Sequence, residues 1–256
     1  VLILAAIVAV LLAATAVSMD FWNVRVEDVL VGQESSSYRV NGEIPVIPLE
    51  SFSDEVASAM EDVSQKMEEQ DLYLNSSPGY WLRTFDRWAD CEEFIGFPLN
   101  NPLEKSSLLE TANYFAIAQD AETLNEESQR HCAVALQGNI KGELQHVTID
   151  TGYLMGPIRI QMTVSLYPEG SGMEPGTGGS WNGEAEFEIT SGVTGEGIPY
   201  TLVVSETPES DYYNDFSSAD AYFVLKNGLY TLDAVSPGRD SGADAKAALE
   251  ELLALF

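Results

Sequence analysis

Basic residues are scarce in this chain of 256 residues, which holds 12 Lys and Arg against 41 Asp and Glu. The resulting formal charge of −29 gives a surface that repels phosphate backbones, so we do not expect nucleic acid as a partner. Anionic membrane surfaces repel such a chain too, and any membrane contact has to be hydrophobic. Apolar residues are not lacking, because they make up 45% of the sequence and are enough to build a core.

Recognisable catalytic motifs are also missing from the sequence. It contains no HExxH, GxSxG, Walker or GxGxxG pattern, and its two histidines leave few candidates for acid–base chemistry. The tripeptide Asp150-Thr151-Gly152 matches the one in aspartic proteases, but those sites need two carboxylates that share a proton, and the chain has no second copy. We therefore expect no catalytic residues and no enzymatic activity.

Metal-binding patterns are equally weak, and we expect neither a metal site nor a cofactor. The acidic stretch near residues 206–215 has no EF-hand pattern, so a solvated acidic loop is the expected structure there. The cysteines and histidines do not have the spacing of a zinc knuckle; they are Cys91, His131, Cys132 and His146.

Cys91 and Cys132 have a simpler interpretation. If the body of the protein lies outside the cell, a single disulfide between them is expected, and the alternative is two free buried thiols. Asn75 begins the sequon Asn-Ser-Ser, which makes it a candidate glycosylation site on such an outer surface.

The most apolar segment runs from Val1 to Val17, where Thr15 is the only polar residue and no charge occurs. As a helix it would span roughly 25 Å, slightly less than a hydrocarbon core of about 30 Å. Three interpretations stay open: a secretory signal peptide, a single-pass membrane anchor, and the assembly helix of a filament subunit. A helix buried in an ordinary globular core is a weaker alternative, because the segment is apolar on every face.

In this hydrophobic N-terminal segment the chain resembles the archaeal pilin-like branch of the type IV pilin superfamily. The chain starts directly on its apolar run, as expected after a prepilin peptidase removes a basic leader, and it carries Ala5 where bacterial members usually have Glu. The resemblance implies an extracellular filament for adhesion or surface attachment, a homopolymer of copies that are first inserted in a membrane. The implied assembly residues are Val1, Leu4, Ile7, Val8, Leu11, Leu12 and Val17.

The alternative function is a single-pass cell-surface or envelope protein whose extracellular body binds a ligand or a partner. The first place to look for that ligand is the aromatic segment that contains Trp81, Phe85 and Trp88, which helical spacing would put on one face. Such a row is more often core packing than a binding platform.

The whole chain is expected to have an α+β fold, because helical and strand patterns are segregated along it. We expect a hydrophobic helix over residues 1–32, a mainly helical region over residues 33–142, and an antiparallel sheet with a C-terminal helix over residues 143–256. Within the helical region, residues 51–70 show the clearest amphipathic period, and residues 107–137 read as two helical pieces. Residues 24–31 fit either a continued helix or a strand, and residues 33–50 look irregular.

In the last region the apolar period changes from 3.6 to 2 residues. Residues 158–167 alternate between apolar and polar side chains, which predicts a half-buried strand with one wet face. Residues 223–232 predict a β-hairpin with Asn227-Gly228 as its turn.

Overall fold

The computed structural model describes most of the body of the protein. The described ranges are 24–32, 35–69, 79–114, 130–139, 142–172, 175–182, 186–206, 216–226, 228–238 and 241–256. The predicted assembly residues from Val1 to Val17 lie outside these ranges, and so do the sequon at Asn75 and the acidic residues 207–215.

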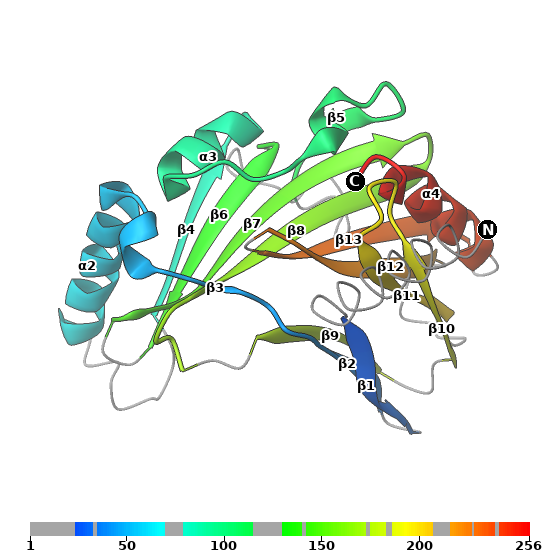
Figure 1. Cartoon of the computed structure of the whole chain (residues 1–256), viewed down its shortest axis with the longest axis horizontal. Coiled ribbons are helices and arrows are strands. Elements are labelled where there is room, and N and C mark those ends of the chain that lie inside the picture. The colour runs from blue at the N-terminus through cyan, green and yellow to red at the C-terminus, as the bar shows by residue number, and fades with distance from the viewer. Residues whose placement is uncertain are drawn as a thin grey trace, which may run out of the picture.

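A large, mostly antiparallel sheet dominates the fold (Figure 1). Its strands are β3 (Val46–Ile47), β4 (Gly79–Phe85), β5 (Glu110–Ala112), β6 (Cys132–Gly138), β7 (Leu144–Met155), β8 (Ile158–Pro168), β10 (Glu186–Val193), β11 (Pro199–Glu206), β12 (Phe216–Leu225) and β13 (Gly228–Pro237). The main path of the sheet runs β10-β11-β12-β13-β8-β7-β6-β4. Off this path, β3 pairs in parallel with the end of β8, and β5 pairs with β7.

A second sheet of three strands lies below the large sheet in Figure 1. It consists of β1 (Arg25–Val31), β2 (Ser35–Asn41) and β9 (Gly176–Asn182), in the order β1-β2-β9. Strand β9 follows β8 in the sequence but pairs with β2, so the small sheet joins two distant parts of the chain.

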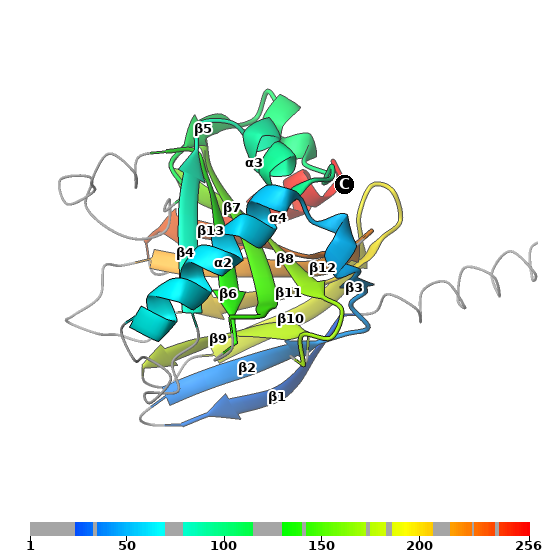
Figure 2. The ribbon, with the colours of Figure 1, turned by 90° about the vertical axis from the view of Figure 1, so that its left-hand side faces the viewer.

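Three α-helices pack on the opposite face of the large sheet, and Figure 2 shows α2 crossing in front of its strands. They are α2 (Asp54–Glu69), α3 (Trp88–Ile95) and α4 (Gly242–Leu253), with the short 3-10 helices η1 (Leu49–Ser51) and η3 (Pro102–Lys105). Helix α2 packs on β4 and β6, whereas α4 packs on β11, β12 and β13. None of the helices in the described ranges has the length and apolarity that a membrane span requires.

The main hydrophobic core lies between the helices and the large sheet. Strand β8 shows how the sequence builds it, because Ile160, Met162, Val164 and Leu166 have no exposed surface and alternate with side chains on the other face. The strand that this period of two predicted is confirmed, but its second face is not wet as expected, because Ser165 and Tyr167 on that face are buried too. The other face of the large sheet meets the three-stranded sheet over a smaller core, which includes Tyr38, Val40, Tyr167, Tyr222 and Leu229.

The predicted α+β fold, with a helical region followed by a sheet region, is wrong, because the described body is mostly antiparallel β-sheet with short helices. Strands occur along the whole described body, and residues 33–142, which were expected to be mainly helical, contain β2 to β6 as well as α2 and α3. The main cause is β6, whose residues from Cys132 to Leu136 are all buried. A strand covered on both faces has no alternation, and its Ala- and Leu-rich sequence favours a helix locally.

Two further segments differ from the sequence expectation. Residues 35–41 form β2 instead of irregular chain, and the alternative of a strand over residues 24–31 is confirmed by β1. Trp81 and Phe85 lie in β4, whereas Trp88 begins α3, so these aromatics do not form one helical face. Phe85 and Trp88 are buried in the main core, as the packing interpretation expected.

Helices α2 and α4 confirm the two amphipathic segments. The hairpin between β12 and β13 is also confirmed, but its turn lies one residue earlier than predicted. Leu225 pairs with Gly228, so Gly228 already belongs to β13 and not to the turn, and Lys226 has a positive φ of 55°. This register determines which side chains face each other further along the two strands.

Candidate functional site

A pocket of about 350 Å³ lies between the two sheets. Its floor is the face of β12 and β13 that points away from the helices, and its opposite wall comes from β2 and β9 of the small sheet. Gly178 and Ser180 of β9 are exposed, so the pocket reaches the surface beside this strand. The lining residues are Tyr38, Thr177, Gly178, Gly179, Ser180, Ser218, Asp220, Tyr222, Thr231, Asp233 and Val235.

Two carboxyl groups form the centre of this pocket. Asp220 on β12 and Asp233 on β13 are directly opposed in the antiparallel register, and they share a hydrogen bond. Side chains in such a pair have Cβ atoms only about 5 Å apart, and like charges there repel each other. The pair is therefore stable only if a proton lies between the two carboxyl groups.

Two tyrosine hydroxyls decide which carboxyl group holds that proton. The Tyr38 hydroxyl donates to Oδ2 of Asp220 at 2.9 Å, and the hydroxyl oxygens of Tyr38 and Tyr222 are 2.5 Å apart. Since the only hydroxyl proton of Tyr38 points to Asp220, Tyr222 is the donor to Tyr38. Asp220 therefore accepts hydrogen bonds from Tyr38 and Asp233, and Asp233 keeps the proton.

The pKa values of the four groups follow from this arrangement. Burial raises the pKa of Asp220 to about 6, although the hydrogen bonds from Tyr38 and Asp233 oppose the change. Burial and the charge of Asp220 raise the pKa of Asp233 well above its ordinary value. Burial and the same charge raise the pKa values of Tyr38 and Tyr222, so both hydroxyls stay protonated and remain donors.

Asp233 also has a carboxyl oxygen that accepts no hydrogen bond from the described residues. Oδ1 of Asp233 is buried and has no hydrogen-bond partner within the described part of the chain. Leaving a buried polar atom unpaired costs about 1–3 kcal/mol. This oxygen is therefore the position at which a donor from a bound molecule would gain most.

The polar character continues across the same face of the large sheet. Gln161 on β8 is in register with Asp233, and it donates to Oδ1 of Asp150 on β7 at 3.2 Å. Thr163 donates to the same oxygen at 2.5 Å. Burial raises the pKa of Asp150, whose side-chain partners are a hydroxyl and an amide. Asp150 thus has the hydrogen-bond partners of a structural residue.

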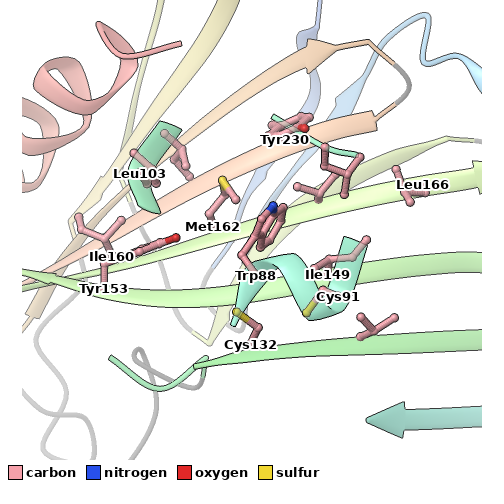
Figure 3. Close-up of a cluster of buried hydrophobic side chains, with 14 of the residues drawn as sticks. Trp88, Cys91, Leu103, Cys132, Ile149, Tyr153, Ile160, Met162, Leu166 and Tyr230 are labelled. Carbon is pink, nitrogen blue, oxygen red and sulfur yellow. The ribbon is translucent and has the colours of Figure 1, made fainter. Parts of the chain in front are cut away.

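The two cysteines lie in the main core, far along the sheet path from the carboxyl pair. Cys91 comes from α3 and Cys132 from β6, both have no exposed surface, and both are free thiols (Figure 3). The thiols are close enough to share a hydrogen bond, which lowers the pKa of Cys132 to about 6. The disulfide between them stays a prediction.

A hydrogen-bonded histidine adjoins these thiols. Nε2 of His131 lies 2.7 Å from Glu104 Oε1 and 3.1 Å from the Thr151 hydroxyl, and Nδ1 lies 2.9 Å from the carbonyl oxygen of Ala112. The Tyr153 hydroxyl donates to the same Glu104 oxygen at 2.8 Å. These contacts join η3, β5, β7 and the residue before β6 in a partly buried network.

His146, the remaining residue of the four considered as zinc ligands, is not part of that network. Its ring stacks on Tyr167 with ring centroids 4.8 Å apart, and burial lowers its pKa to about 4. Over the ranges that the structure describes, no three His, Cys, Asp or Glu side chains are placed to hold a metal ion.

Sequence reasoning missed the residues of the pocket. Asp220 and Tyr222 alternate with buried small or aromatic residues in one strand, and Asp233 interrupts an apolar stretch in the next. The available signal was the hairpin itself, because residues at equal distances from its turn face each other. Comparisons of the chain with protein-family models, curated proteins and solved structures find no match.

Proposed function

We propose that this chain is a ligand-binding protein of the cell surface, whose apolar N-terminal run anchors it in a membrane and whose body binds a small polar ligand between its sheets. The observation that carries the proposal is the buried, unpaired Oδ1 of Asp233, because Asp233 and Asp220 both line a pocket that reaches the surface. A ligand donor would pair this atom, so binding relieves a cost that the free protein carries.

Binding is better supported than catalysis by the groups around the pocket. The lining offers hydroxyls, two carboxyl groups and two tyrosine rings, but no histidine, cysteine or lysine. A carboxyl pair with one proton can perform acid–base chemistry. Here, however, the Tyr38 hydroxyl already occupies Oδ2 of Asp220, which would have to act as the base.

A ligand screen on the full chain in detergent micelles tests this proposal. Small polar compounds are screened by ligand-observed NMR, and each hit is measured again with Thr231→Phe, which fills part of the pocket. Thr111→Phe is the matched control, because Thr111 is exposed on β5 and does not line the pocket. Hits should be lost with Thr231→Phe and kept with Thr111→Phe. A screen without hits, or hits that Thr231→Phe does not affect, would contradict a binding role for the pocket.

The second candidate function is the pilin-like filament subunit, favoured by the uncharged segment from Val1 to Val17. In that case copies of the segment pack together, and burial of apolar surface holds the polymer together. Electron microscopy of purified material should then show filaments, and Val8→Asp should abolish them. Val29→Asp serves as the control, because Val29 is exposed on β1 of the body. Intact filaments of the Val8→Asp variant would rule out assembly through this segment.

A further inference from the structure

We propose that the ligand of the pocket is a protonated amine, whose ammonium group binds between Asp220 and Asp233 and replaces the proton that they share. This inference rests on the proposed binding function and adds the chemical class of the ligand. It is supported by the charge, the hydrogen-bonding groups and the shape of the pocket.

The charge of the residues that line the pocket favours a cationic ligand over an anionic one. Two carboxyl groups face the pocket, and none of its lining residues is Lys, Arg or His. Asp220 is only 8% exposed, so its negative charge is largely removed from water without a basic partner. A buried charge of this kind is strongly stabilised by an ion of opposite sign.

The hydrogen-bonding groups select a donor. Asp233 Oδ1 is an acceptor without a partner, and the loss of the shared proton would free a second carboxylate position beside it. Thr231, which has a hydroxyl side chain, also lines the pocket. An ammonium group has three N–H donors and no acceptor, so it matches this set, whereas a carboxylate or phosphate ligand would repel it.

The size and the walls of the pocket favour an organic amine over a metal ion. About 350 Å³ is at the lower end of the volume range of small-molecule sites and far exceeds a bare ion. The rings of Tyr38 and Tyr222, with centroids 6.1 Å apart, are in the lining, and aromatic faces attract organic cations. Calcium instead takes about six to eight oxygen ligands, and only two carboxyl groups are present here.

The exchange of charge is balanced. The free pocket holds one carboxylate and one carboxylic acid, and the bound pocket holds two carboxylates with one ammonium ion, so one proton passes to solvent. The ionisable groups that face the pair are Tyr38 from β2 and Tyr222 from β12, and the lining residues of β9 contribute none. Because a proton is released, the amine should bind up to about tenfold more tightly for each unit of increasing pH.

The test uses pairs of an amine and a neutral alcohol of similar shape on the full chain in detergent. Benzylamine is compared with benzyl alcohol, and ethanolamine with ethylene glycol, by calorimetry at several pH values and in buffers of different ionisation enthalpy. We expect each amine to bind roughly tenfold or more tightly than its alcohol, because charge-assisted hydrogen bonds are the stronger ones. The buffer comparison should show release of about one proton per bound amine.

Variants separate the carboxyl pair from general charge effects. Asp233→Asn should weaken amine binding and remove its pH dependence, whereas Asp62→Asn, on the exposed side of α2, should change neither. Alcohols that bind as well as amines would overturn the ligand class and leave the pocket as a binding site. Binding of neither class would overturn the proposed function as well, and amine binding without proton release would overturn the exchange.

Discussion

The proton shared by Asp220 and Asp233 makes the stability of the protein depend on pH in a calculable way. An unfolded chain loses its Asp protons near the ordinary pKa of about 3.9. The folded protein keeps the Asp233 proton well above that pH, because burial and the charge of Asp220 raise its pKa. At this site the folded state therefore binds one more proton than the unfolded chain, and the free energy of unfolding falls as pH rises through this window. Asp220, whose pKa is raised to about 6, adds to the fall over the lower part of the window.

The magnitude follows from proton linkage. One extra proton in the folded state gives a slope of about 1.4 kcal/mol per pH unit, or about 2.7 kcal/mol between about pH 5 and about pH 7. Asn at position 233 keeps the shape and the donor but has no proton to lose. The unfolding free energy of Asp233→Asn should thus fall less than that of the wild type, by at least this amount over the window.

Urea titrations followed by tryptophan fluorescence measure both proteins at each pH. The difference between the two curves isolates Asp233, because Asp220, His131 and the thiols titrate in both proteins. Asp62→Asn serves as the control for a lost exposed charge and should run parallel to the wild type. Parallel curves for Asp233→Asn and the wild type would show that the pair does not share a proton.

Three further predictions concern the hydroxyl chain, the cysteines and a glycine. Tyr38→Phe removes a donor to Asp220, so the pKa of this carboxyl should rise above about 6; carboxyl NMR titration checks this, and an unchanged pKa would refute the hydrogen bond. Under oxidising conditions Cys91 and Cys132 should form a disulfide that raises the free energy of unfolding by roughly 3 to 4 kcal/mol. Mass spectrometry after alkylation should then find neither thiol alkylated, and two alkylated thiols would refute the disulfide. Gly96→Ala should lower the unfolding free energy by about 1–3 kcal/mol. The φ of Gly96 is 101°, and a Cβ there would lie 2.8 Å from the backbone nitrogen of Ser53. An unchanged urea midpoint would count against this strain.

Local periodicity predicted the elements whose two faces differ in polarity and failed for those whose faces are both apolar. Strand β8 and helix α2 have a strong period of two or of about 3.6, and both were found where expected. Strand β6 lies between β4 and β7 with both faces covered, so its sequence carries no period. Strand β2 is defined mainly by its pairing with β9, which is remote in sequence, and no local pattern contains that information.

The carboxyl pair was missed for a related reason. A hairpin turn centred on Asn227-Gly228 would have set Asp220 opposite Val235, on the same face but two positions away from Asp233. The observed pairing of Leu225 with Gly228 moves the register and brings the two acids together. Sequence reasoning identified the hairpin, but a shift of one residue at the turn hid the pair.

The two walls of the pocket are also separated in the order of synthesis. Strands β1 and β2 leave the ribosome early, but the register joins Tyr38 to Gly179 of β9, which is made much later. A two-stranded hairpin is marginally stable by itself. The wall formed by β1 and β2 therefore becomes stable only after β9 and the smaller core beneath it have formed. Pairing between such distant segments is slow. The pocket is therefore completed late in folding. We also expect the three-stranded sheet to unfold locally before the large sheet does. Such local unfolding would expose Asp220 and Asp233 to solvent and leave the main core intact.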